Sequence, residues 1–354
     1  MSKYPFNREE ELKDVGYFDA IPAIYRGGMG QPVRRFNTPI TAKENLLRVF
    51  KKEMPEWAPN MDTDINMIQP LVLPDASARV FGGIDCFGID WKFEPTAGAA
   101  MVRPGTRRLS DVTEWENELT FMDLSQIDWE KDYKENYENC LSRDRCTGFV
   151  IVNGCFERLA DLTSFEDCLC SLLTEPEAVS ALFDRLTDWH IELARIAREV
   201  YKADFITFHD DMGTQRSSFI SPDMYEEMLL PHHKRMNDAI HAMGMYVNYH
   251  SCGNVGNLLG KFIDAGFDTW EGQSNANNKA ELMEKYGDRL GQFSGLMIDE
   301  NTTDEQAAEL IENVIKTEGK TGRMVLTVRD LKTDRNPNTA EIQYVKSREF
   351  YSSL

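Results

Sequence analysis

The segment YVNYHSCGNVG, residues 246–256, combines side chains that bind metal ions. A run of β-branched and aromatic residues ends at His250 and Cys252, and turn-forming Gly253 follows. Because residues two apart in a strand point to the same side, His250 and Cys252 converge on one spot where the strand ends. An imidazole nitrogen and a thiolate so placed make half of a zinc site. The spacing equally allows a buried cysteine beside a structural histidine, since buried cysteine usually behaves as a small hydrophobic residue.

A second polar cluster, His209-Asp210-Asp211, ends the apolar run FITFHDD. One interpretation is a metal ligand, a general acid or base, or a partner that orients His250. The alternative is that Asp210 or Asp211 caps the following helix or holds a loop. We take His209, Asp210 and Asp211, together with Glu157, as candidate catalytic residues for proton handling.

These side chains need a scaffold, and from residue 149 onward apolar strand-like runs alternate with amphipathic helical stretches. The predicted strands are residues 149–154, 205–211, 246–253, 267–273, 289–298 and 323–330. Strand and helix alternating at this pace predict a parallel sheet, and six such units with strands apolar on both faces favour a (β/α)8 TIM barrel. We expect residues 41–354 to form this single domain and residues 1–40, with the segment 26–39, to form an arm or lid.

Polar residues gather at the carboxyl ends of these strands, where a parallel barrel places its active site. Read in order, the strand ends carry Asn153 and Glu157; His209, Asp210 and Asp211; His250 and Cys252; Glu271 and Gln273; Asp299 and Glu300; Arg329 and Asp330. The strand starts show nothing comparable, so the pattern predicts an active site at one end of the barrel.

The composition limits the partners. A formal net charge of −20 over 354 residues argues against nucleic acid or an anionic membrane as a partner. No apolar run reaches the roughly 18 residues of a membrane span, and the start has no secretory signal pattern, so we expect a cytoplasmic protein. The seven cysteines form no CxxC pair, which indicates reduced thiols rather than disulfides. A homodimer is left open.

Three stretches, residues 40–59, 205–268 and 286–299, resemble the uroporphyrinogen decarboxylase superfamily, and most of all its branch of cobalamin-dependent methyltransferases. This resemblance implies a single (β/α)8 barrel. It also implies that the His-x-Cys motif, here His250-Ser251-Cys252, binds zinc on a barrel strand. In the type that methylates coenzyme M, a further cysteine follows the last strand. The corresponding stretch here, residues 324–341, has no cysteine, and by register Asp330 takes that place.

The resemblance implies a zinc-dependent methyltransferase of one-carbon metabolism, typical of anaerobes. The substrate would be a methoxylated or methylated small molecule or a thiol acceptor. Since no cobalamin-binding motif is found in this sequence, the corrinoid would be carried by a partner corrinoid protein.

Two alternatives remain. One is a decarboxylase of porphyrinogen-like substrates, but the arginine-rich motif of those enzymes is not found. The five candidate arginines lie in a different context: Arg34, Arg35, Arg103, Arg107 and Arg108. The other alternative is a non-catalytic binding barrel of the same fold.

Overall fold

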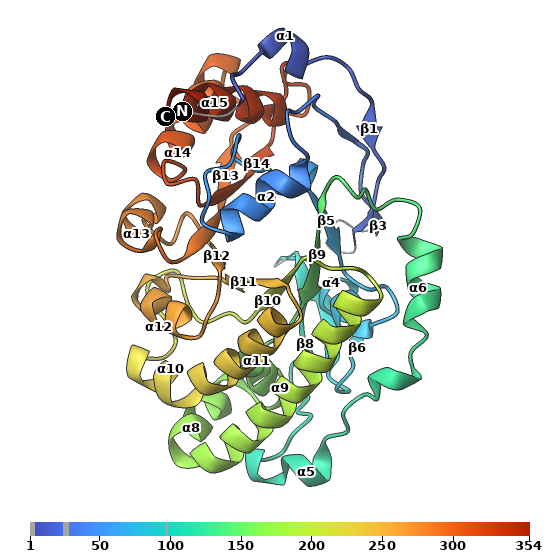
Figure 1. The fold of residues 1–354 in the computed structure, drawn as a ribbon. Coiled ribbons are helices and arrows are strands. Elements are labelled where there is room, and N and C mark those ends of the chain that lie inside the picture. Colours follow the sequence, from blue (N-terminus) through green and yellow to red (C-terminus); the bar gives the residue numbers. More distant parts are fainter. Residues whose placement is uncertain (1–3, 24–27, 97) are drawn as a thin grey trace.

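The computed structural model describes residues 4–23, 28–96 and 98–354. Its centre is a parallel sheet of seven strands, which Figure 1 shows surrounded by helices. In spatial order the strands are β14 (Met324–Asp330), β13 (Gly291–Ile298), β12 (Thr269–Gly272), β11 (Tyr246–Ser251), β10 (Phe205–His209), β9 (Cys146–Ile151) and β5 (Ile65–Ile68). All neighbouring strands are parallel, as the sequence predicts.

The sheet curls so that its two edges approach each other. Asn60, shortly before β5, forms a parallel bridge with Leu326 of β14, and the Leu326 amide donates to the Pro59 carbonyl at 2.8 Å. Within the described residues the curled sheet therefore has seven strands and one bridge, where a complete barrel has eight strands.

Most helices follow the strands in the predicted order. They are α2 (Ala42–Phe50), α3 (Met61–Asp64), α4 (Pro74–Phe81), α5 (Trp115–Glu118), α6 (Trp129–Asn136), α7 (Cys155–Leu162), α8 (Phe165–Thr174), α9 (Pro176–Glu199), α10 (Pro222–Met228), α11 (Leu230–Ala242), α12 (Leu259–Asp264), α13 (Lys279–Tyr286), α14 (Asp304–Thr317) and α15 (Thr339–Ser353). Between Ser221 and Gly244 the chain forms two helices, α10 and α11, rather than one. Pro231 explains the division, because a proline inside a helix removes one backbone hydrogen bond and clashes with the preceding turn. None of the described helices is long and apolar enough to cross a membrane.

Strand β11 shows how the two faces of the sheet differ. Val247 and Tyr249 point to the surrounding helices, and the Tyr249 ring lies 4.3 Å from that of Phe267. Strand alternation therefore directs Asn248 and His250 to the interior. At the amino end of the barrel, α2 closes this interior with an apolar cluster that includes Leu46, Val49, Phe50, Ile65, Phe205, Phe293 and Val325.

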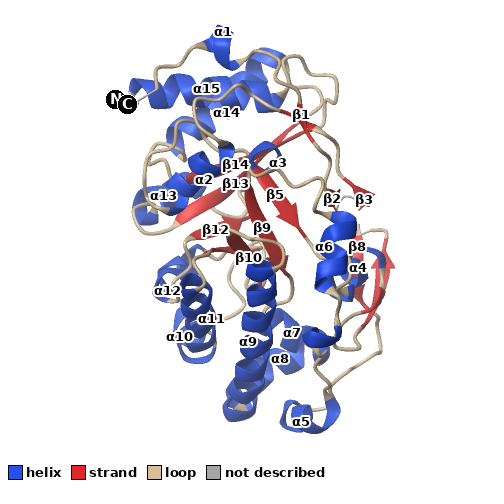
Figure 2. Ribbon diagram, turned by 45° about the vertical axis from the view of Figure 1, so that its right-hand side comes forward, coloured by secondary structure: helices blue, strands red, loops and turns tan. Residues whose placement is uncertain are grey.

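An insertion of residues 74–102 follows β5, which is the first strand of the sheet along the chain. It consists of α4 and an antiparallel sheet of β6 (Gly83–Ile84), β7 (Asp90–Glu94) and β8 (Ala99–Val102), visible in Figure 2. The side chain of Arg158 on α7 is fully buried and binds Asp75 and Asp85 of this insertion, each at 2.7 Å.

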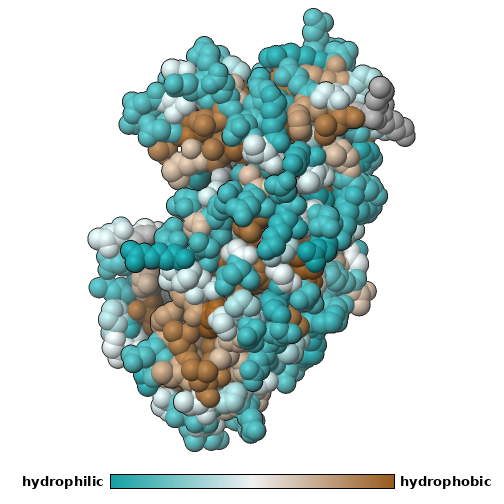
Figure 3. All heavy atoms as spheres, turned by 90° about the vertical axis from the view of Figure 1, so that its left-hand side faces the viewer, coloured by the Kyte–Doolittle hydropathy of each residue, from teal (hydrophilic) through white to brown (hydrophobic). Residues whose placement is uncertain are grey.

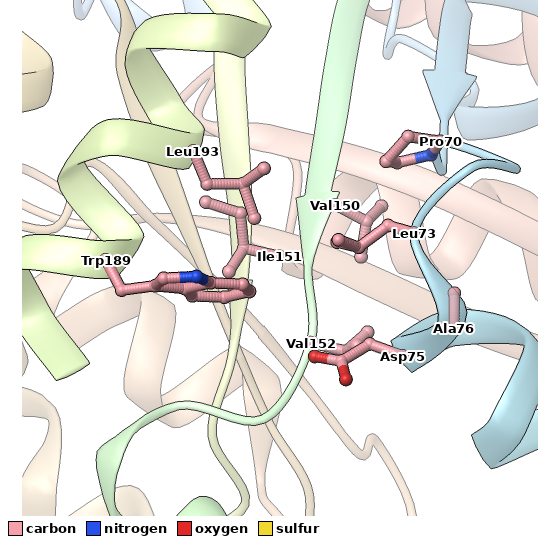
Figure 4. A pocket seen from close by; sticks show the side chains of 9 residues that line it. All are labelled: Pro70, Leu73, Asp75, Ala76, Val150, Ile151, Val152, Trp189 and Leu193. Atoms are coloured by element: carbon pink, nitrogen blue, oxygen red, sulfur yellow. The ribbon is translucent and has the colours of Figure 1, made fainter. Parts of the chain in front are cut away.

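Nearby, β9, α4 and α9 enclose a void of about 10 Å³, which Figure 4 shows lined mainly by apolar side chains. A space of that size holds at most one water molecule.

The described part of the N-terminal segment packs on the C-terminal helix. Helix α1 (Arg8–Glu11) brings Glu11 to the buried Arg348 of α15, with two contacts of 2.8 Å. Two short antiparallel pairs, β1 (Tyr17–Phe18) with β4 (Val33–Arg34) and β2 (Pro22–Ala23) with β3 (Gly28–Met29), follow α1. The division between an arm of residues 1–40 and a domain of residues 41–354 stays a prediction, and residues 1–3 and 24–27 of that arm lie outside the described residues.

The face of the molecule shown in Figure 3 has a mainly hydrophilic surface. This face is hollowed at one side, and hydrophobic side chains gather above and below the hollow.

Candidate metal centre at the end of the sheet

His209 and His250 are register partners at the carboxyl ends of the adjacent strands β10 and β11. In parallel strands, register partners project from the same face. Their imidazole rings consequently stack, with centroids 4.3 Å apart and an interplanar angle of 9°. Both rings point to the interior at the end where polar residues were predicted to gather.

Each ring is held by a glutamate. The Nδ1 atom of His209 lies 2.7 Å from Glu157 Oε2, and the Nδ1 atom of His250 lies 3.2 Å from Glu271 Oε1. Glu271 is the register partner of His250 on β12, and its other oxygen accepts from Asn248 at 3.0 Å. With Nδ1 occupied in both rings, the two Nε2 atoms remain available for another ligand.

Asp211 faces both Nε2 atoms. Its Oδ1 lies 3.9 Å from His209 Nε2 and 3.8 Å from His250 Nε2. The Cys252 amide donates to the same Oδ1 at 2.6 Å, and the Cys252 thiol lies 3.5 Å from His250 Nε2. Among the histidine, cysteine, aspartate and glutamate side chains within the described part of the chain, one group of three or more has all its ligand atoms within 4.8 Å of one another. This group consists of His209, Asp211 and His250.

The electrostatics of the site follow from burial and pairing. Burial alone would lower the pKa of His250, but Glu271, Cys252 and Asp211 hold that pKa well above its ordinary value. Burial would raise the pKa of Glu157, but His209 and Arg79 hold it well below its ordinary value. Burial raises the pKa of the Cys252 thiol, and His250 opposes this effect. His250 likewise lowers the pKa of Glu271 against the effect of burial. The lowered pKa values favour the ionised form of both glutamates, which suits acceptors that orient the imidazoles.

Asp210 faces away from this group. Its fully buried carboxylate accepts from the amides of Phe156 at 3.1 Å and Glu157 at 2.8 Å, in the first turn of α7, and lies 3.5 Å from His233 Nε2. Asp210 therefore caps a helix, which is one of the two roles expected from the sequence. The helix that it caps is α7, which precedes Asp210 in the chain, and not the following helix. By fixing this turn, Asp210 places Glu157 beside His209.

Asp330 is not brought to the group. At the end of β14 its carboxylate binds the guanidinium of Arg335 and accepts from the Lys332 amide at 3.1 Å. Arg335 also donates to Asp304 at 2.9 Å, so Asp330 belongs to a network at the β14 end.

Two neighbours of the site were not among the predicted site residues. Glu271 stood among the polar strand ends, and its register with His250 explains its role. Arg79 donates to Glu157 Oε1 at 3.2 Å from α4, and no pattern in the sequence connects these two residues.

The five arginines considered for a carboxylated substrate have partners elsewhere. Arg34 pairs with Glu341, Arg35 with Asp144, Arg103 with Asp90 and Arg107 with Asp167. Arg108 donates to the carbonyls of Phe87 and Glu118.

The family model described as uroporphyrinogen decarboxylase (URO-D) matches residues 85–322. The chain belongs to the URO-D family. This membership agrees with the resemblance found in the sequence and places the curled parallel sheet among the TIM barrels, as predicted.

Solved structures with a similar fold include a methyltransferase from Methanosarcina mazei. It has a TM-score of 0.64 and 16% sequence identity, and the match covers 88% of this URO-D family chain and 99% of that chain. A sugar phosphate isomerase/epimerase from Parabacteroides distasonis matches with a TM-score of 0.34 and 10% identity over 66% of this chain and 82% of that chain. This second likeness is too remote to bear on function. No curated protein matches the chain.

Proposed function

We propose that this URO-D family protein is a zinc-dependent methyltransferase that moves a methyl group between a small molecule and a corrinoid protein. The fold shared with the methyltransferase from Methanosarcina mazei supports this proposal. The observation that carries it is the set of donors at the end of the sheet, in which Cys252 Sγ lies 3.5 Å from His250 Nε2.

The residues present fit a metal ion. Imidazole nitrogen, thiolate and carboxylate are the donors that zinc takes in proteins. Two ligands of one tetrahedral zinc ion are roughly 3.3–3.8 Å apart when each lies 2.0–2.3 Å from the metal. The 3.5 Å between Cys252 Sγ and His250 Nε2 agrees with that spacing. His250 and Cys252 would hold the ion, and Asp330 is the third ligand predicted from the sequence.

When bound, zinc supplies Lewis acidity, which either favours the thiolate form of a thiol acceptor or makes an ether oxygen a better leaving group. The surrounding residues prepare the site for this chemistry. Glu157 and Glu271 fix the two imidazole rings, and Asp211 accepts from the Cys252 amide. The corrinoid partner would dock at the end of the barrel where these residues lie, in the cytoplasm.

A single-turnover assay tests the proposal. Protein loaded with zinc is mixed with cob(I)alamin and a panel of methoxylated aromatics and methylamines, or with methylcobalamin and a thiol. We expect the absorbance of one cobalamin form to convert to the other with at least one substrate. Zinc-loaded protein that transfers no methyl group in either direction, and instead releases CO₂ from a carboxylated porphyrinogen, would favour the decarboxylase. Failure of both reactions would favour a non-catalytic binding barrel.

A further inference from the structure

We infer that the metal ion is held by His209, Asp211 and His250, with Cys252 as the fourth donor, and that Asp330 is not a ligand. The substrate would then bind as a fifth ligand, since catalytic zinc sites can expand to five-coordinate. This inference rests on the proposed function, because it concerns the same site. It replaces the one-histidine set expected from the sequence with a set of two imidazoles, one carboxylate and one thiolate.

The first argument is distance. Asp211 Oδ1 is 3.9 Å from His209 Nε2 and 3.8 Å from His250 Nε2, and Cys252 Sγ is 3.5 Å from His250 Nε2. The two nitrogen–oxygen separations exceed a direct hydrogen bond, and all three separations are close to the roughly 3.3–3.8 Å expected between ligands of one tetrahedral ion. A cation between His209, Asp211 and His250 would lie at bonding distance from these three donors after a small adjustment. Cys252 is the next donor, beside His250.

The second argument is orientation. A histidine that binds a metal usually donates its other ring nitrogen to a carboxylate, which fixes the tautomer and the direction of the ring. His209 and His250 both have this arrangement, with Glu157 and Glu271 as the carboxylates. Because a glutamate orients each of the two rings in the same way, we infer that both Nε2 atoms bind the same metal ion.

The third argument concerns Asp330. Its two oxygens already accept from the guanidinium of Arg335 and the amide of Lys332. The Arg335 side chain is only 1% exposed, so withdrawing Asp330 to a metal would leave a buried charge with Asp304 as its remaining acidic partner. Desolvation makes that rearrangement costly. Asp330 therefore stabilises the end of β14.

The donor set also indicates which ions bind. Two imidazoles and a carboxylate suit Zn²⁺, Co²⁺ and Fe²⁺, and a single thiolate makes the site harder than one rich in cysteine. The chemical class of the ligand is thus a divalent first-row transition-metal ion, and Co²⁺ serves as a spectroscopic probe.

The experiment titrates the metal-free full-length protein with Zn²⁺ and Co²⁺ against a chromophoric chelator. The variants are His209→Gln, Asp211→Asn, Cys252→Ser and Asp330→Asn, with His241→Gln as the control. His241 pairs with Asp268 at 2.9 Å on the outside of the sheet. We expect His209→Gln and Asp211→Asn to weaken binding by more than about 100-fold, since even residues that only orient a ligand change affinity about 10- to 100-fold. Asp330→Asn and His241→Gln should bind as the wild type does. Cys252→Ser should keep the cobalt d–d bands and lose the thiolate charge-transfer band.

A measurement on the wild-type protein guards against variants that fail to fold. X-ray absorption of the zinc-loaded protein should show two imidazoles and one sulfur, whereas the set of His250, Cys252 and Asp330 would show one imidazole. Metal binding lost in Asp330→Asn but kept in His209→Gln, or a single imidazole in the absorption data, would overturn this inference and leave the proposed function standing. Absence of metal binding in the wild type would overturn both.

Discussion

The imidazole rings of His209 and His250 lie face to face, 4.3 Å apart, because the two residues occupy the same register on adjacent parallel strands. This relationship holds two nitrogen donors side by side on a rigid sheet. Sites built on strands keep their geometry better than sites on loops. The remaining donors, Asp211 and Cys252, follow these strands within two residues, so the whole group is positioned by the ends of β10 and β11.

Replacing Glu157 or Glu271 by glutamine should weaken metal binding about 10- to 100-fold while the fold persists, because each glutamate orients one imidazole. Competition with a chromophoric chelator measures the change. Glu226→Gln, which alters an exposed pair with Lys261, is the matched control. Equal affinities in all three variants would show that the glutamates do not orient metal ligands.

Cys252→Ser should lower methyl transfer by orders of magnitude and leave the fold intact. The side chain lies in the site, and its thiol lies 3.5 Å from His250 Nε2. Single-turnover rates and circular dichroism together check this prediction. Normal turnover in the variant would contradict a mechanism that needs the Cys252 thiolate.

Gly154→Ala should destabilise the protein by about 1–3 kcal/mol, as overpacking in a core does. A Cβ at this position would lie 2.5 Å from Cβ and Cγ of Asp210, which caps α7. Displacing that carboxylate should also shift Glu157 and weaken metal binding. Urea unfolding measures the stability, and Gly260→Ala, whose Cβ would meet nothing within 4 Å, should show no such loss.

Arg158→Met should lower the free energy of unfolding by about 3 to 5 kcal/mol, because it leaves two buried carboxylates, Asp75 and Asp85, without their cation. Arg195→Met on the exposed face of α9 removes pairs with Glu192 and Glu199 and should cost less than about 1 kcal/mol. Equal decreases in the free energy of unfolding for the two variants would contradict a stabilising role of the buried ion pairs between Arg158 and the insertion.

Asp161→Asn should reduce the loss of stability that the wild-type protein shows as the pH rises to alkaline values. Burial raises the pKa of Asp161 to about 8, with Glu157 and Asp85 adding to the shift and Arg79 and Arg158 opposing it. A carboxyl whose pKa is raised in the folded state binds more protons there than in the unfolded chain, so stability falls as pH rises from about 4 towards 8. Asparagine still accepts the 2.8 Å hydrogen bond from Asn153 and cannot ionise.

Urea unfolding at pH 6 and pH 8.5 checks this sign. The stability of the wild type should decrease more between the two values than that of Asp161→Asn. The same decrease in both proteins would mean that Asp161 is ionised throughout this range.

The sequence by itself determined the alternation of strands and helices, the end of the sheet at which polar residues gather, and the convergence of His250 and Cys252. These features are local: apolar periodicity specifies an element, and residues two apart in a strand share a face. The division between α10 and α11 is equally local, because it follows from Pro231.

Only the tertiary structure decided which donors meet. The pairing of His209 with His250 depends on the register between β10 and β11. Asp330 ends β14, three strands away from β11 in the sheet, where it pairs with Arg335. Arg79 reaches Glu157 across 78 residues of sequence. Register and long-range ion pairs arise from packing between elements, and a single sequence carries no periodic pattern for contacts between residues so far apart.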